Sequence, residues 1–287
     1  MLLALRGEAL VRHPPRRARE GVSGAALSPL RGRGMEYAES REYAVGDDAR
    51  HMDWRVTARS GRPHTKLFQP ERERATWIVA DRSPGLYFGT KVRYKSVQAA
   101  RLGAVAAWSA LNDGDRIGAL CGSASEPPRM PAGGMRGVLP VLEAMVRWYS
   151  LPDEGHSLER ALQQLRRMAR PGARIVVLAD PANVVAIDVA QWRALAKRGE
   201  LHVLLATDAF EQSPPRCRLR FLSAGMRSEL DLGGADAHLR WQRQFAGTLQ
   251  QALAAIRDAG GEAQAVATDA SASEWLMGFR AAQAEVA

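Results

Sequence analysis

Two aspartates that follow short apolar runs are the residues of this chain best placed to do chemistry. Asp81 follows the run from Ala75 to Ala80, and Asp180 follows the run from Ala173 to Ala179. Ser83 comes two residues after Asp81, and its hydroxyl together with the two carboxylates could supply oxygen ligands to a hard cation such as Mg²⁺. The alternative is that Asp81 and Ser83 cap the turn that follows, through hydrogen bonds from the backbone to their side chains.

Other catalytic motifs are weak or missing. No G-x-x-x-x-G-K-[ST] loop and no G-x-S-x-G elbow occurs, and the six histidines lack metal-ligand spacing. Asp47 and Asp48 could be a carboxylate pair for acid–base work, but adjacent carboxylates after a glycine are more typical of a solvated turn. A metal-dependent hydrolase built on Asp81 and Asp180 would lack a nucleophile or a base. We therefore expect a protein without an enzymatic activity of its own.

The elements that must position these aspartates alternate regularly after residue 74. Nearly all-apolar strands are predicted at 75–80, 116–121, 173–179, 201–206 and 263–268, with a further strand at 218–222. Helices are predicted at 95–111, 135–149, 157–169, 187–198, 239–259 and 274–284. Apolar strands alternating with helices are typical of a parallel sheet that is covered on both faces. We therefore predict an α/β domain over residues 75–287, with its site at the carboxyl ends of the strands, where Asp81 and Asp180 would meet.

The N-terminal residues carry much of the formal net charge of +9. In the first 33 residues, seven arginines are opposed by two acidic residues, Glu8 and Glu20. We predict a basic N-terminal arm over residues 1–30, which could bind nucleic acid, anionic lipid or an acidic protein face. Aromatic residues are not interleaved with these arginines, which does not favour nucleic acid.

Residues 31–74 are a dense polar block that lacks helical or strand periodicity over most of its length. A segment of this kind cannot be stabilised by burying an apolar face of its own. Its arginines at 41, 50, 55 and 59 can form bidentate pairs with its aspartates at 47, 48 and 53, and such pairs fix loop geometry. Tyr43 and Trp54 could anchor the block on the main domain. The block can serve as a scaffold, as a docking surface, or as both.

The run from Arg41 to Arg59 reads R-E-Y-A-V-G-D-D-A-R-H-M-D-W-R-V-T-A-R. It resembles the signature R-x-Y-x-x-G-D-x-x-R-x-I-D-W-x-x-x-A-R of the bacterial "domain of unknown function 58" family, and the resemblance covers about residues 25 to 285. The residues of this run that we expect to form an interaction surface are Arg41, Tyr43, Gly46, Asp47, Asp48, Arg50, Asp53, Trp54 and Arg59.

The resemblance implies a von Willebrand factor A-like, Rossmann-like domain, preceded by an irregular polar segment that packs on it. It also implies a metal-ion-dependent adhesion site of the pattern D-x-S-x-S, for which this chain supplies Asp81 and Ser83 but has Gly85 in place of the last serine. Asp180 stands in the place of a further aspartate ligand. Because Gly85 replaces the last serine, the expected Mg²⁺ site is incomplete.

The resemblance further implies a partner, because members of this family act with a MoxR-type AAA+ ATPase in the maturation or remodelling of client proteins. We therefore expect a non-enzymatic adaptor that binds such an ATPase and a client of unknown identity. The alternatives are a nucleic-acid-binding protein that uses the basic arm, and a metal-dependent adhesion-type binding module.

Composition favours a cytoplasmic protein. No stretch approaches the roughly 20 apolar residues of a membrane span. The run from Met1 to Leu5 is too short for the core of a secretory signal. The two cysteines, Cys121 and Cys217, lack metal-ligand spacing, and Cys121 lies in an apolar run where we expect it to be buried.

Overall fold

The chain forms two compact units. The computed structural model describes residues 1–12, 35–44, 46–70, 74–150, 155–223 and 226–276. The larger unit comprises Met1–Arg17 and Arg74–Ala287, and the smaller unit comprises Ala18–Glu73.

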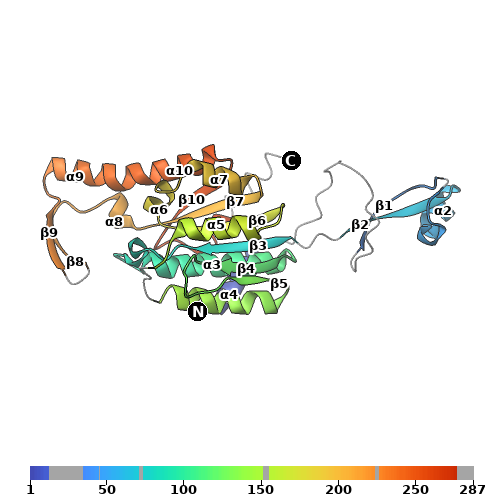
Figure 1. The fold of residues 1–287 in the computed structure, drawn as a ribbon, viewed down its shortest axis with the longest axis horizontal. Helices are drawn as coiled ribbons and strands as arrows, with labels where there is room; N and C mark the ends of the chain where they lie inside the picture. The colour runs from blue at the N-terminus through green and yellow to red at the C-terminus, as the bar shows by residue number, and fades with distance from the viewer. Residues whose placement is uncertain (13–34, 45, 71–73, 151–154, 224–225, 277–287) are drawn as a thin grey trace. The chain divides into compact units, whose positions relative to one another are not determined.

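A six-stranded sheet forms the centre of the larger unit (Figure 1). Its strands are β3 (Ala75–Ala80), β4 (Arg116–Leu120), β5 (Arg129–Ala132), β6 (Ala173–Ala179), β7 (Gly199–Thr207) and β10 (Glu262–Ala267). They lie in the order β10-β7-β6-β3-β4-β5; neighbours run parallel, except that the edge strand β5 runs antiparallel to β4. When the six strands are numbered in chain order and the sheet is read from β5 to β10, this is the doubly wound order 3-2-1-4-5-6. The predicted α/β class with a mostly parallel sheet is confirmed.

Helices cover both faces of this sheet (Figure 1). One layer contains η1 (Leu2–Ala4), α1 (Leu5–Arg12), α3 (Lys95–Asn112) and α4 (Met135–Trp148), and the other contains α5 (Leu158–Met168), α6 (Pro181–Val185), α7 (Val189–Ala196) and α10 (Thr248–Asp258). Because side chains alternate along a strand, Ile78 and Ala80 of β3 pack into the first layer while Trp77 and Val79 pack into the second. Within the described residues, no helix combines the length and the apolarity needed to cross a membrane.

The N-terminus differs from the arm predicted over residues 1–30. Its first twelve residues form η1 and α1, which pack on α3. Leu2, Leu5 and Ala9 are buried, and Trp108 Nε1 donates a hydrogen bond to the carbonyl oxygen of Leu2 at 3.2 Å. These apolar residues lie on one stripe of a helix, so burial outweighs the charge pattern on which the prediction of an arm was based. The remainder of the predicted arm lies outside the described residues.

The C-terminal third also departs from the predicted elements. The predicted strand 218–222 exists as β8 (Arg218–Ser223), but it pairs antiparallel with β9 (Met226–Asp231) in a separate two-stranded sheet. The predicted helix 239–259 is interrupted: α9 (Ala235–Gln242) passes through a π-helical segment, η4 (Arg243–Gly247), into α10. A short α8 (Ala209–Gln212) follows β7. Most of the predicted helix 274–284 lies outside the described residues.

The smaller unit is more regular than its sequence pattern indicates. Strands β1 (Met35–Glu42) and β2 (His64–Pro70) pair antiparallel, with Glu42 opposite His64. Between them lie a 3-10 turn, η2 (Ala49–His51), and helix α2 (Trp54–Ser60). Gly61 ends α2 at a φ of 71°, a left-handed conformation that glycine adopts without strain. Local caps and turns thus replace the apolar periodicity that the segment lacks. Whether this unit packs on the larger one, as its sequence suggests, stays a prediction.

Candidate functional site

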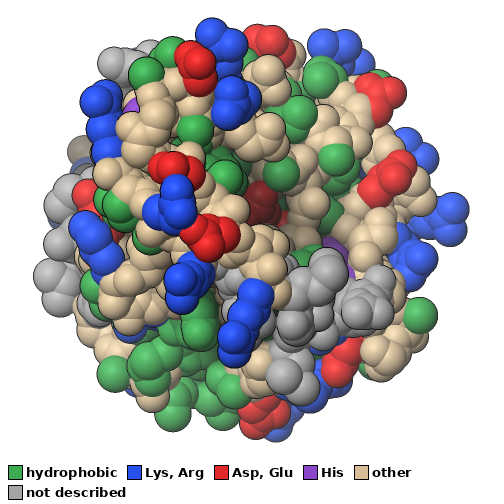
Figure 2. Space-filling view, turned by 90° about the vertical axis from the view of Figure 1, so that its left-hand side faces the viewer, with side chains coloured by type: hydrophobic (Ala, Val, Ile, Leu, Met, Phe, Trp, Pro, Cys, Tyr) green, Lys and Arg blue, Asp and Glu red, His purple; other side chains and the backbone are tan. Residues whose placement is uncertain are grey.

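The carboxyl ends of the parallel strands bring a group of polar residues to one edge of the sheet. Asp81 follows β3, Asp180 follows β6, Asp208 follows β7 and Thr268 follows β10. Figure 2 shows this face of the larger unit, with a hollow at its centre and an acidic side chain at the floor of the hollow. The predicted meeting of Asp81 and Asp180 is confirmed, because the backbone N–H of Asp180 donates to Asp81 Oδ2 at 3.0 Å.

Asp81 is completely buried and its carboxylate is fully engaged. Oδ1 accepts from the backbone N–H of Ser83 at 2.9 Å and lies 2.9 Å from His156 Nε2. Oδ2 accepts from Asn183 Nδ2 at 2.8 Å and from the Ser83 hydroxyl at 3.2 Å, besides the Asp180 N–H. Burial by itself raises the pKa of Asp81, but the contacts with His156, the Asp180 N–H and Asn183 outweigh it, so the pKa is lowered and the group is ionised.

Both ring nitrogens of His156 are engaged as well. Nε2 faces Asp81, and Nδ1 faces the carbonyl oxygen of Cys121 after β4. The imidazole side chain is 3% exposed. It therefore ties the start of α5 to the ends of β3 and β4, and neither nitrogen is open to a substrate.

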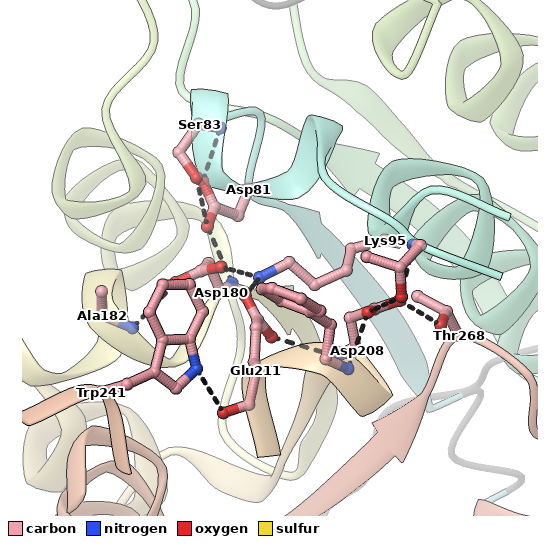
Figure 3. Close-up of polar contacts among 11 residues, drawn as sticks. Asp81, Ser83, Lys95, Asp180, Ala182, Asp208, Glu211, Trp241 and Thr268 are labelled. Atoms are coloured by element: carbon pink, nitrogen blue, oxygen red, sulfur yellow. Dashed lines mark hydrogen bonds and ion pairs between the residues drawn. The ribbon is translucent and has the colours of Figure 1, made fainter. Parts of the chain in front are cut away.

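A second buried cluster joins α3, the end of β6 and α8 (Figure 3). Lys95 Nζ lies 2.6 Å from Asp180 Oδ2 and 2.6 Å from Glu211 Oε1, and Lys95 is 1% exposed. Asp180 Oδ1 caps α6 by accepting from the Ala182 N–H at 2.9 Å. Burial by itself lowers the pKa of Lys95, but its two carboxylate partners outweigh burial and raise it, so the amine is charged.

Asp208 completes the edge of the sheet (Figure 3). Its buried carboxylate accepts from the Thr268 hydroxyl at 2.7 Å, from the Thr90 N–H at 3.1 Å and from the Phe210 N–H at 3.0 Å. Glu211 Oε2 in turn accepts from the Asp208 N–H at 3.0 Å, which closes a capping box at the start of α8. Burial by itself raises the pKa of Asp208, but the Thr90 hydroxyl and these other donors outweigh burial and lower the pKa.

The residues predicted to hold Mg²⁺ come together but do not fit an octahedral site. Mg²⁺ demands six oxygen ligands at close to 2.0–2.1 Å. The Asp81 carboxylate is surrounded by protein donors, Ser83 donates its hydroxyl to Asp81, and Asp180 is bound to Lys95. The alternative prediction holds for Asp81, which accepts from the backbone N–H of Ser83, but not for the Ser83 side chain, which donates to Asp81 and makes no capping bond. In the part of the chain that the structure describes, no group of three or more His, Cys, Asp or Glu side chains is arranged to hold a metal ion.

An open pocket of about 530 Å³ lies beside Asp81, between the loops that follow β3 and β6. This is the switch point of the strand order, where doubly wound sheets bind ligands. Its lining combines polar and apolar side chains from those two loops and from the start of α5: Ser83, Pro84, His156, Ser157, Leu158, Glu159, Asn183, Ala186 and Ile187.

In the smaller unit, four signature residues form one tight turn. Arg41 Nη2 pairs with Asp47 Oδ1 at 2.6 Å, and the Tyr43 hydroxyl donates to the Asp47 carbonyl oxygen at 3.2 Å. The Ala44 N–H donates to Asp47 Oδ2 at 3.0 Å. Gly46 has a φ of 108°, which a residue with a side chain rarely adopts. These signature residues therefore hold the turn itself.

The remaining signature aspartates split between pairing and capping. Asp48 makes the predicted bidentate pair with Arg50, at 3.1 Å from both Nε and Nη2. Asp53 was expected to pair with an arginine, but this is wrong: it accepts from the Ser40 hydroxyl at 2.6 Å and caps α2 through the N–H groups of Arg55 and Val56. A carboxylate at a helix start is better placed for backbone donors than for a side chain further along the helix.

Trp54 and Arg59 take no part in these contacts. Trp54, the first residue of α2, is 69% exposed, and its predicted role of anchoring the block on the main domain stays a prediction. Arg55 and Arg59 are exposed on the same helix. The signature therefore contains residues whose contacts stabilise the smaller unit and residues whose side chains are exposed on its surface.

Lys95, His156 and Glu211 were not identified from the sequence. Lys95 carries a signal, because a cation at the first residue of a helix opposes the helix dipole and needs an acidic partner. Glu211 follows Asp208 by three residues, the spacing of a capping box. His156 carries no local signal, since Asp81 lies 75 residues away in the sequence.

Comparison with known proteins places this geometry in a family. The model described as "Protein of unknown function DUF58" matches residues 39–252 of the chain. The chain belongs to the DUF58 family. The matched residues include helix α2, and they include the buried polar residues Asp81, Lys95, Asp180, Asp208 and Glu211.

The chain is also similar to curated proteins of this kind. Uncharacterized proteins of Mycobacterium bovis and Mycobacterium tuberculosis are 32% identical to it over 193 residues, which is 65% of this chain and 59% of theirs. The match thus spans about three-fifths of the length of these relatives. Among solved structures, a mutant of the PilB minor pilin from Streptococcus sanguinis aligns with a TM-score of 0.35 and 11% identity, covering 78% of this chain and 64% of that one.

Proposed function

We propose that this DUF58 protein is a non-enzymatic adaptor that binds a MoxR-type AAA+ ATPase through its smaller unit and acts with it on client proteins. ATP hydrolysis is the work of the partner, since the chain has no P-loop of its own. The family resemblance supports the partner class. A cytoplasmic location belongs to the same proposal and is supported by two free cysteines, Cys121 and Cys217.

One observation carries the docking role: α2 displays an aromatic side chain beside two arginines that have no acidic partner among the described residues. Every acidic side chain that the structure describes in this unit is already engaged. Glu42 pairs with Arg62 at 3.0 Å, Asp47 with Arg41, and Asp48 with Arg50, while Asp53 serves the start of α2. Among the side chains that the structure describes here, Arg55 and Arg59 therefore have no acidic partner.

This face, made by Trp54, Arg55 and Arg59 and called here the α2 face, has the composition of a binding surface. Tryptophan and arginine are the residues most enriched among those that dominate binding energy. A tryptophan that is 69% exposed contributes little to its own fold and has most of its apolar area left to bury against a partner. The uncompensated positive charge favours an acidic surface on the ATPase.

The edge of the sheet in the larger unit supports the absence of catalysis. A general base or nucleophile must be within hydrogen-bond reach of its substrate. Asp81, Asp180, Asp208 and both nitrogens of His156 are instead engaged with neighbouring protein groups. Their role in this proposal is to hold the loops around the pocket.

The proposal is tested by binding and ATPase assays with a MoxR-type ATPase from the same organism. We expect association, and a change in ATPase rate when this protein is added. Trp54→Ala is expected to weaken binding at least about 10-fold, the loss typical of a residue that dominates an interface. Arg55→Glu with Arg59→Glu should weaken it further, because like charges would then meet.

The matched control is Tyr94→Ala, which removes an aromatic side chain that is 56% exposed on the larger unit. It should leave the affinity unchanged. Circular dichroism should show that Trp54→Ala folds as the wild type does, since the side chain is exposed. Absence of both association and a rate effect would refute the adaptor role, while association that is indifferent to Trp54→Ala would refute the α2 face.

A further inference from the structure

We infer that Lys95 is the resident cation of the site at the sheet edge: its ammonium group takes the place of the divalent ion that a von Willebrand factor A-like site would hold. Asp180 and Glu211 then take their counter-charge from the protein itself, and binding at this edge is independent of divalent metal. This inference does not depend on the adaptor role.

The position of the ammonium group supports this reading. Nζ lies 2.6 Å from a carboxylate oxygen of Asp180 and 2.6 Å from one of Glu211, and these groups come from α3, from the end of β6 and from α8. A single positive charge at the meeting point of three separate elements is the arrangement that a bound metal ion would otherwise create. The side chain of Lys95 is 2% exposed, so water does not screen the attraction between the ammonium group and the two carboxylates.

Gly85 provides an independent observation. It occupies the position of the last serine in the D-x-S-x-S pattern. A Cβ atom built on Gly85 would lie 3.1 Å from Asp180 Oδ2 and 3.3 Å from its Cγ, which is tighter than an ordinary van der Waals contact. The oxygen it would crowd is the one that binds Lys95. The missing hydroxyl ligand and the internal ammonium are therefore two parts of one arrangement.

The placement of Lys95 on its helix points the same way. It is the first residue of α3, an 18-residue helix, where the helix dipole disfavours a cation. A buried lysine at that position is stable as a cation because two carboxylates face it. Burial raises the pKa of Glu211, which shares its ammonium partner with Asp180.

The inference has a consequence for recognition at this edge. In a metal-dependent adhesion site the ion offers an open coordination position to an acidic group of the ligand. Lys95 is buried and offers none, so a ligand of the neighbouring pocket must be held by hydrogen bonds and apolar contact.

The first experiment measures Mn²⁺ binding to the wild-type protein and to Asp180→Asn by titration calorimetry. We expect no binding that depends on Asp180, and no rise in melting temperature when EDTA is replaced by 10 mM Mg²⁺. A site with a dissociation constant of about 0.1 mM would be about 99% occupied at that concentration and would raise the melting temperature by several degrees. One Mn²⁺ bound by the wild type and lost in Asp180→Asn would overturn the inference.

The second experiment compares Lys95→Ala with Lys197→Ala, which removes an exposed lysine from the end of α7. In EDTA, Lys95→Ala should melt several degrees lower than the control, because Asp180 and Glu211 lose their shared cation. Restoration by Mn²⁺ would show that a metal can take the place of the ammonium group. If Lys95→Ala fails to fold, the titration of the wild type still decides the question. A Lys95→Ala protein as stable as the wild type in EDTA would contradict the inference.

Discussion

Replacing Asp81 by asparagine tests whether the buried carboxylate holds the edge of the sheet together. The substitution keeps the shape of the side chain but exchanges one acceptor oxygen for an NH₂ group. In the wild type, Oδ2 accepts from the Asp180 N–H, from Asn183 Nδ2 and from the Ser83 hydroxyl, and Oδ1 accepts from the Ser83 N–H. The NH₂ group of an asparagine at this position would therefore face protein groups that are themselves hydrogen-bond donors.

The size of the effect follows from these contacts. If the new NH₂ replaces Oδ2, the N–H of Asp180 and the amide of Asn183 lose their acceptor. If it replaces Oδ1, the N–H of Ser83 loses its acceptor. Each buried donor left without an acceptor costs about 1–3 kcal/mol. Since the protein adopts the less costly orientation and also loses hydrogen bonds to a charged group, we expect a loss of about 2–3 kcal/mol in the free energy of unfolding.

Urea denaturation at pH 7, followed by the fluorescence of the buried tryptophans of the larger unit, measures this loss. Asp188→Asn is the matched control, because Asp188 caps α7 through the Ala190 N–H at an exposed position. Asparagine and aspartate are comparable caps, so the control should change little. A loss at Asp81 that is below about 1 kcal/mol and no larger than the control would refute the view that this carboxylate is structural.

The pH dependence gives a second readout of the same variant. The pKa of Asp81 is lowered in the folded protein from 3.8, so its contribution to stability is fully present above pH 3.8. It is lost as the pH falls through the lower pKa of the folded state. The difference in stability between the wild type and Asp81→Asn should therefore narrow below pH 3.8 and stay constant above it. A difference that grows on acidification would mean that the group is not ionised in the folded state.

Two further predictions concern local structure. Gly46→Ala forces a residue with a side chain to adopt a φ of 108°, so it should lower the free energy of unfolding of the smaller unit by about 1–3 kcal/mol. Urea denaturation of the wild-type protein and of the variant measures this loss. No change would show that the turn relaxes freely. Glu126 has its pKa lowered to about 2, chiefly by Arg147, whose side chain is 48% exposed. Because solvent screens this pair, Glu126→Gln should cost only about 0.5 kcal/mol at pH 7, and the cost should vanish in high salt and as the pH falls toward 2; a cost that is insensitive to salt would contradict this.

The parallel sheet was predictable because its signal is local. The run from Ala173 to Ala179 is entirely buried in β6, and apart from Arg174 it is apolar, which is typical of a strand covered on both faces. The carboxyl ends of such strands share one edge of the sheet, which is why the sequence pattern already placed Asp81 and Asp180 together. The basic charge of the N-terminus, in contrast, concealed an apolar stripe that packs on α3.

The smaller unit illustrates a different limit. Its hairpin and helix are held by single caps and pairs such as Arg41 with Asp47, and contacts of this kind leave no periodicity in the sequence. A family signature marks the residues as important without saying why each is needed. In the folded protein Asp53 caps α2, whereas the neighbouring Trp54 is exposed on the surface of α2.

The α/β class, the strand that carries each aspartate and the family signature could all be read from the sequence, because each depends on residues close together in the chain. The contacts of the aspartates, in contrast, depend on residues far apart in the chain and are visible only in the folded protein. Lys95 meets Asp180 across 85 residues and Glu211 across 116, and these contacts arise from the order in which strands lie in the sheet. That order brings an ammonium group to the carboxylates, and it makes an expected metal site into a buried ion cluster of the protein's own side chains.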